Sequence, residues 1–246
     1  MNRKDNFLQF RLPSLAVHDV QVFYAKIGDF RPDLAKYFDL LAEPERARVN
    51  NFRLIADKER FVLARGWSKL LLAQHLQLAP KAIEFAYTSH GKPYLANSLG
   101  LQFNISHAED VVLLAFGQLP LGVDIEYMHR DLEVDRIAQE FFHQHEFKAL
   151  AQLTGLHKQQ DFFRLWVAKE AFSKALGLGL SYDLAKIELL LTSAESLQIV
   201  SIHDPAENLA DWHIQPLTIM PNYLAALAFK GKVQNLLVQN LQNLLT

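Results

Sequence analysis

The spacing of hydrophobic residues predicts strands and helices in alternation along the whole chain. Where apolar and β-branched residues alternate or form short runs, we expect strands at Leu15–Tyr24, Ile83–Tyr87, Leu101–Ile105, Val111–Phe116, Leu121–Ile125, Ile187–Leu191, Leu197–Ile202, Trp212–Ile219 and Tyr223–Phe229. Where apolar residues recur at the helical period, we expect helices at Pro32–Leu41, from Glu43 onward, Ala56–Leu76, Asp161–Leu180 and Val233–Leu245.

The predicted elements occur twice in the same order. Each half of the chain begins with a strand, continues with helices and ends with antiparallel strands, and residues 118–120 suit a short linker between the halves. No repeat is visible in the sequence itself. We therefore predict an α+β fold of two similar subdomains, residues 1–118 and 119–246.

Two acidic patterns stand out against the apolar elements that carry them. Asp124 and Glu126 flank Ile125 at strand spacing, so their side chains share one face, and Glu170 and Lys174 lie one turn apart on the predicted helix. Three carboxylates of this kind suit a hard divalent cation, with Lys174 beside it for phosphate. A simpler interpretation is that Glu170 and Lys174 form only an i, i+4 ion pair, worth about 0.2–0.5 kcal/mol.

Composition narrows the class of protein. The chain has 246 residues, half of them hydrophobic, with a formal net charge of -2 and no cysteine. Disulfides, thiol chemistry and cysteine-ligated zinc are excluded, and the mild charge argues against nucleic-acid or membrane binding. The N-terminus lacks the apolar core of a signal peptide, and no stretch is long enough to span a bilayer. We expect a soluble cytoplasmic protein.

Cationic and polar residues also gather locally. Arg46, Arg48, Arg60 and Arg65 make one helical region basic, although solvated helix faces with surface ion pairs would look the same. Further along, Ser106 and His107 crowd the end of a predicted strand, and the segment 90–93 reads as a tight turn. Taken alone, the turn suits an ordinary hairpin and His107 an ordinary hydrogen-bonded histidine.

Several of these stretches together resemble one family. They are GKP at residues 91–93, FNISH at 103–107, GVDIE at 122–126, FF…EF at 141–147 and WVAKEAFSKALGLGL at 166–180. In this order and at these intervals they resemble the 4′-phosphopantetheinyl transferases, in particular the two-domain class that activates surfactin synthetase and similar carrier-protein systems. The resemblance covers residues 46 to 180.

The resemblance implies a reaction and its partners. The phosphopantetheine arm of coenzyme A would move to a serine of an apo acyl or peptidyl carrier protein, and adenosine 3′,5′-bisphosphate would leave. The family's architecture further implies a pseudo-dimeric arrangement of the two subdomains within a monomer. Two other functions stay open: a metal-dependent hydrolase of nucleotide diphosphates, and a non-catalytic module that binds carrier proteins.

The same resemblance implies roles for individual residues. Asp124, Glu126 and Glu170 would hold Mg²⁺, with Mn²⁺ as the other option, and Asp124, Glu170 and Lys174 would be catalytic, with Glu170 also the base for the serine proton. The residues expected to contact coenzyme A are Arg46, Arg48 and Arg60 at the 3′-phosphate, Ser106 and His107 at that or nearby phosphates, Lys174 at the diphosphate, and Lys92 and Pro93 at the adenine end.

Overall fold

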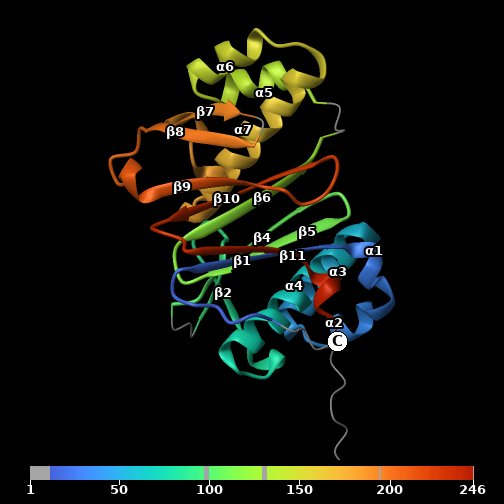
Figure 1. The fold of residues 1–246 in the computed structure, drawn as a ribbon. Coiled ribbons are helices and arrows are strands. Elements are labelled where there is room, and N and C mark those ends of the chain that lie inside the picture. The colour runs from blue at the N-terminus through green and yellow to red at the C-terminus, as the bar shows by residue number, and fades with distance from the viewer. Residues whose placement is uncertain (1–11, 97–99, 129–131, 194, 246) are drawn as a thin grey trace, which may run out of the picture.

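The computed structural model describes residues 12–96, 100–128, 132–193 and 195–245, and they form a layered α+β fold (Figure 1). Its strands are β1 Asp19–Lys26, β2 Phe85–Tyr87, β3 Pro93–Leu95, β4 Gln102–Ala108, β5 Val111–Gly117, β6 Leu121–Tyr127, β7 Ile187–Ser193, β8 Ser196–Ile202, β9 Trp212–Leu217, β10 Tyr223–Lys230 and β11 Asn235–Asn240. Its helices are α1 Ile27–Phe30, α2 Leu34–Phe38, α3 Glu43–Asn51, α4 Ile55–Leu76, α5 Val134–Phe141, α6 Gln144–Ala151 and α7 Gly155–Leu176. Within the described residues, none of these helices combines the length and apolarity needed to cross a membrane.

The two halves of the chain share one connectivity. A four-stranded sheet has the order β11-β1-β5-β4, and a three-stranded sheet has the order β6-β10-β9. In the first sheet β1 pairs antiparallel with β5 and β5 with β4, and in the second sheet β6 pairs in the same way with β10 and β10 with β9. Two-stranded ribbons, β2-β3 and β7-β8, occupy matching places in the chain. The order of predicted elements indicates this α+β arrangement correctly.

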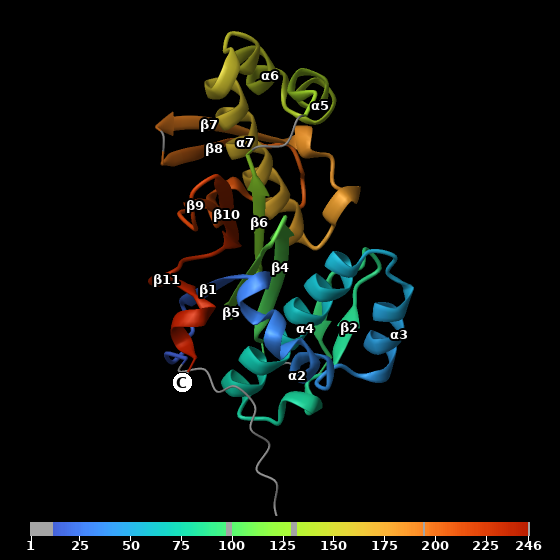
Figure 2. The ribbon, with the colours of Figure 1, turned by 90° about the vertical axis from the view of Figure 1, so that its right-hand side faces the viewer.

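The sheets lie between two groups of helices (Figures 1 and 2). Helices α1 and α4 pack on the first sheet with α2 and α3 against α4, whereas α7 packs on β6 and β10 of the second sheet with α5 and α6 against α7. All seven residues of β5 are buried, because one face packs on α4 and the other packs on the second sheet. The core between the sheets contains Val20, Val22, Leu113, Val123, Ile125 and Leu227.

Strand β6 lies directly on the backbone of α7 at Gly122. A Cβ atom at this position would lie 2.2 Å from the carbonyl oxygen of Ala171 and 2.3 Å from the backbone nitrogen of Ala175. Only glycine allows so close an approach. The contact holds Asp124, two residues further along β6, beside the helix that carries Glu170.

Each half also buries one glutamate–lysine ion pair. Glu45 of α3 lies 2.9 Å from Lys69 of α4, and Glu146 of α6 lies 2.8 Å from Lys169 of α7. Both lysines are almost fully buried, and both glutamates accept the backbone N–H at the N-cap of their own helix. A buried charge of this kind needs its partner, so each pair fixes a short helix on a long one.

The expected C-terminal helix at 233–245 is wrong. The segment forms β11, which pairs in parallel with β1, followed by a 3₁₀ turn at Leu241–Leu244 that buries Leu241 and Leu244 in the first core. The exposed edge of β1 offers backbone groups that a packed helix would leave unpaired. The other predicted elements are present, with ends shifted by a few residues and the expected helix at residues 32–41 split into a 3₁₀ turn and α2. Because β11 lies in the first sheet, the domain boundary at residues 118–119 stays a prediction. Residues 1–11, which the signal-peptide argument concerns, lie outside the described residues.

Gly122→Ala should destabilise the fold. The added methyl group would push β6 away from α7, and overpacking of this kind costs about 1–3 kcal/mol or more. The free energy of unfolding in urea measures the effect. Gly28→Ala is the matched control, because among the described atoms none lies within 4 Å of its Cβ position. Equal stability of the two variants would contradict the close contact.

Candidate active site

The three predicted metal ligands line one cleft of about 280 Å³. It lies where β4, β6 and α7 meet, between the two halves of the chain. Its walls are formed by Ile105, Ser106, His107, Asp124, Glu126, Trp166, Glu170 and Lys174. Residues from three separate stretches of sequence are therefore brought together, and we call this the acidic cleft.

Lys174 pairs across the cleft and not only along its own helix. Its Nζ lies 2.6 Å from Asp124 Oδ1 and donates to Ser106 Oγ at 2.8 Å, and the Ser106 hydroxyl donates to the same carboxylate oxygen at 2.8 Å. The three groups form a closed triangle that links both halves. The simple i, i+4 interpretation of Glu170 and Lys174 does not describe this arrangement.

The donor set of the acidic cleft suits a hard cation. Asp124 is 5 % exposed, and its second oxygen, Oδ2, is buried without a hydrogen-bond partner among the described residues. An unpaired buried carboxylate oxygen is costly unless a ligand meets it. The carboxylates of Glu126 and Glu170 face the same cleft. The carboxylates of Asp124, Glu126 and Glu170 do not all lie within 4.8 Å of one another. Among the described residues, the group of His, Asp or Glu side chains that meets this spacing lies elsewhere.

Glu170 carries its charge at a cost. The side chain lies in the buried part of α7, and burial, followed by the neighbouring carboxylate of Asp124, raises its pKa above the ordinary value, while Lys174 partly offsets the rise. Two carboxylates that repel each other in one cleft favour a positive ligand there. A glutamate whose pKa is raised by burial and by a neighbouring carboxylate is typical of a cation-binding site.

A second cleft, of about 480 Å³, continues from the first. Ile105 and His107 line both clefts, so the two are adjacent along β4. We call it the basic cleft, because its other lining residues include Arg48, Arg60 and Arg65. Burial, with Arg60 and Lys174 adding to the effect, lowers the pKa of His107 to about 4. A pKa this low leaves the imidazole neutral at pH 7, so that one ring nitrogen can donate and the other can accept a hydrogen bond.

Arg65 is held as a fixed cation in the basic cleft. It is 5 % exposed, its guanidinium lies 4.5 Å from the centre of the Phe85 ring, and its Nη2 donates to the Tyr87 hydroxyl at 3.1 Å. Its Nη1 is buried without a hydrogen-bond partner among the described residues. Such a donor suits an anionic ligand.

The structure turns two of the predicted ligand-binding residues toward the backbone. Arg46 donates to the carbonyl oxygens of Leu41 and Asp39 at 2.9 and 3.1 Å. Lys92 Nζ donates to the carbonyls of Leu121, Lys174 and Ala175, and burial lowers its pKa to about 8. Neither lines the basic cleft, whereas Pro93, Arg48 and Arg60 do.

Three of the lining residues are not among the site residues that the sequence predicts. Trp166 stands in the acidic cleft, and Tyr87 and Asn104 line the basic one. Asn104 Oδ1 also accepts the backbone N–H of Val123 at 2.9 Å, which connects β4 to β6. Trp166 directly precedes the VAKE segment and Asn104 precedes Ser106 by two, so position within these stretches was the available signal.

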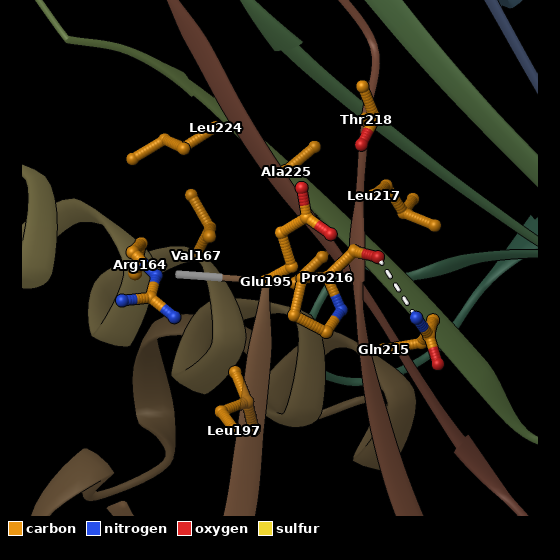
Figure 3. A pocket seen from close by; sticks show the side chains of 11 residues that line it. Arg164, Val167, Glu195, Leu197, Gln215, Pro216, Leu217, Thr218, Leu224 and Ala225 are labelled. Carbon is orange, nitrogen blue, oxygen red and sulfur yellow. Dashed lines mark hydrogen bonds between the residues drawn. The ribbon is translucent and has the colours of Figure 1, made fainter. Parts of the chain in front are cut away.

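A further cavity of about 200 Å³ lies between α7 and strands β8–β10 (Figure 3). Arg164, Val167 and Leu217 line it, and of the described residues no predicted site residue does. Arg164 is held by Asp161 and by the carbonyls of Ser193 and Ser196. The cavity is separate from the two clefts that share β4.

Fold and clefts together define an α+β protein whose acidic and basic groups meet at the junction of its two sheets. The family model described as "4'-phosphopantetheinyl transferase, N-terminal" matches residues 30–118, and the model of the 4'-phosphopantetheinyl transferase superfamily matches residues 120–228. The 4'-phosphopantetheinyl transferase HetI of Nostoc sp. is 34% identical over 195 residues, 78% of this chain and 79% of that protein. The chain belongs to the 4′-phosphopantetheinyl transferase family.

More distant relatives extend the comparison. The 4'-phosphopantetheinyl transferase Sfp of Bacillus subtilis is 26% identical over 78% of this chain and 83% of that protein. Among solved structures, a holo-(acyl-carrier-protein) synthase from Bacillus anthracis in complex with CoA (3′,5′-ADP) is 18% identical, with a TM-score of 0.39 over 46% of this chain and 96% of that one. A likeness this distant transfers nothing about the site.

Glu170→Gln should raise the stability of the ligand-free chain at neutral pH. The pKa of Glu170 is higher in the folded chain than its ordinary value of 4.5, so between those two values the folded state binds more protons than the unfolded state. Stability therefore falls as pH rises through this window, and a neutral amide removes the loss. Urea unfolding at about pH 5 and about pH 8 should show the larger advantage at the higher pH.

The control for this comparison is Glu140→Gln, which changes an exposed carboxylate on α5. Its effect on the free energy of unfolding should be small and the same at both pH values. A Glu170→Gln chain no more stable than the parent at about pH 8 would show that Glu170 carries its charge without cost.

Proposed function

We propose that this chain transfers the phosphopantetheine arm of coenzyme A to a serine of an apo acyl or peptidyl carrier protein. The serine oxygen bonds to the phosphorus that carries the arm. The bond from that phosphorus to the bridging oxygen of the diphosphate breaks, and adenosine 3′,5′-bisphosphate leaves with the electron pair. The observation that carries the proposal is the acidic cleft continuing, through Ile105 and His107, into the basic cleft.

The acidic cleft is the proposed reaction centre. Asp124, Glu126 and Glu170 would hold Mg²⁺ or Mn²⁺, and the unpaired Oδ2 of Asp124 supports this role. The bound ion would neutralise charge on the diphosphate. Glu170, whose pKa is raised, is the proposed acceptor of the serine proton, directly or through water.

Lys174 is proposed to hold the diphosphate. Its ammonium group lies on Asp124 Oδ1 and Ser106 Oγ, within the same cleft. A phosphate oxygen in the cleft could take the place of either contact, since a lysine head group donates in three directions. Ser106 and His107 would then hydrogen-bond neighbouring phosphate oxygens.

The basic cleft is the proposed place of the nucleotide end of coenzyme A. Arg48, Arg60 and Arg65 face it, and the unpaired Nη1 of Arg65 supports binding of the 3′-phosphate there. Pro93 would pack against the adenine end. Arg46 and Lys92 keep a structural role in this proposal, because neither lines the basic cleft and both donate to backbone carbonyls.

The proposal includes a cytoplasmic monomer whose two subdomains meet at residues 118–119. A monomer is supported by the acidic cleft, whose walls come from β4 of one half and from β6 and α7 of the other. One chain thus supplies both sides of the site. Coenzyme A is an intracellular substrate, which supports the cytoplasm as the place of action.

Asp124→Ala and Glu170→Ala should each lower the transfer rate by at least about a hundredfold, because each removes charge from the reaction centre. The assay mixes the chain with coenzyme A, Mg²⁺ and an apo carrier protein and measures the mass gained by the carrier. Asp211→Ala, which removes an exposed acid outside both clefts, is the control and should keep the parent rate.

The same assay separates three functions. Mass gain on the carrier supports transfer, nucleotide release without a carrier supports a diphosphate hydrolase, and binding without either supports a non-catalytic module. Normal transfer by folded Asp124→Ala or Glu170→Ala protein, checked by circular dichroism, would remove the proposed metal site.

Arg60→Ala and Arg48→Ala should weaken coenzyme A binding by about tenfold or more, because each loses a charged hydrogen bond to phosphate. Isothermal titration measures the affinity. Arg46→Ala is the matched control, since Arg46 points to carbonyls of residues 39 and 41 and should leave the affinity unchanged. With 3′-dephospho-coenzyme A as ligand, the variants of the basic cleft should differ little from the parent. Equal losses for all three arginines would contradict this placement.

A further inference from the structure

Three histidines and a glutamate meet where the start of α6 lies beside the β7–β8 ribbon. Figure 1 shows α6, β7 and β8 at the end of the molecule opposite α1–α4. His143 and His145 stand at the start of α6, Glu188 lies in β7, and His203 follows β8. Neither the acidic nor the basic cleft includes any of the four. The proposed transfer reaction leaves this cluster without a role.

The cluster has the spacing of a metal site. His143, Glu188 and His203 each offer one ligand atom, and these atoms all lie within 4.8 Å of one another. The rings of His143 and His203 are stacked, with centroids 5.8 Å apart and planes 14° from parallel. Among the described residues, this is the group of His, Asp and Glu side chains that meets the spacing.

A second layer of contacts orients the ligands. His145 Nδ1 lies 2.7 Å from one oxygen of Glu188, and the Ser201 hydroxyl donates to the other oxygen at 3.1 Å. The same hydroxyl lies 3.0 Å from His203 Nε2. Metal-binding carboxylates and imidazoles are commonly held by outer partners of this kind, which fix their direction.

We propose that this cluster binds Zn²⁺, with His143, Glu188 and His203 as ligands and His145 supporting Glu188. Two imidazoles and one carboxylate form a donor set that Zn²⁺ accepts, whereas Mg²⁺ prefers oxygen ligands alone. His203 is exposed, so its ring can turn toward the ion without disturbing the core. The site is therefore distinct in chemistry from the acidic cleft.

An ion bound here would stabilise the contacts that hold helix α7 against α6 and β7. Glu146, next to His145, accepts the backbone N–H of Leu189, next to Glu188, at 2.7 Å. Glu146 also forms the buried ion pair with Lys169, the residue before Glu170. Zn²⁺ would join α6 to the β7–β8 ribbon beside this pair, so the expected effect is a higher unfolding temperature.

The test titrates Zn²⁺ into the full chain, purified without a polyhistidine tag and kept in excess Mg²⁺, with a chromophoric chelator as competitor. One ion should bind per chain, and Co²⁺ in its place should give the visible absorption of a tetrahedral site. His203→Ala should weaken Zn²⁺ binding by at least about tenfold. His157→Ala, which removes an exposed histidine of α7, should bind as the parent does.

Thermal unfolding provides the second measurement. Zn²⁺ should raise the unfolding temperature of the parent and of His157→Ala, and not that of His203→Ala or Glu188→Gln. The proposal is overturned if the parent binds no Zn²⁺, or if His203→Ala binds it as tightly as the parent. Binding that survives His203→Ala and disappears in Asp124→Ala would place the ion in the acidic cleft and overturn it equally.

Discussion

The contact between Gly122 of β6 and the backbone of α7 is the constraint on which the site depends. Because no side chain separates strand from helix, the carboxylate of Asp124 comes within reach of groups on α7. Lys92 strengthens the same joint from the other half, since it donates to Leu121 at the start of β6 and to the last turn of α7. A cation at a helix C-terminus is favourable in itself. The acidic cleft exists because these elements are held this close.

The sequence predicted which side chains lie together in the acidic cleft better than it predicted which cations line the basic cleft. A strand period and a helix period are enough to align Asp124 with Glu126 and Glu170 with Lys174, and both alignments hold. Periodicity cannot tell whether a cation faces a cleft or a carbonyl, so it gives no sign that Arg46 and Lys92 donate to backbone carbonyls. The histidine cluster joins positions up to 60 residues apart, beyond any local pattern.

The two halves of the chain resemble each other in their buried glutamate–lysine pairs more than in their sequences. Each uses a glutamate near the start of a short helix to hold a lysine of a 22-residue helix, as Glu45 with Lys69 and Glu146 with Lys169 show. Pairing a buried charge is obligatory, whereas the apolar residues around it can vary in kind as long as they fill the space. A shared architecture can therefore be present where no repeat is visible along the chain.

The parallel pairing of β11 with β1 has a consequence for how the chain is made. Asp19 pairs with Asn235, so the first sheet is completed by a strand that is synthesised after β2–β10. Until then the nascent N-terminal half presents a bare β1 edge, the kind of template on which strands of other chains can add. Contacts between residues this distant in sequence also form late in folding, because a long loop must close first. The protection of that edge therefore has to wait until the strands of both sheets that precede β11 have been made.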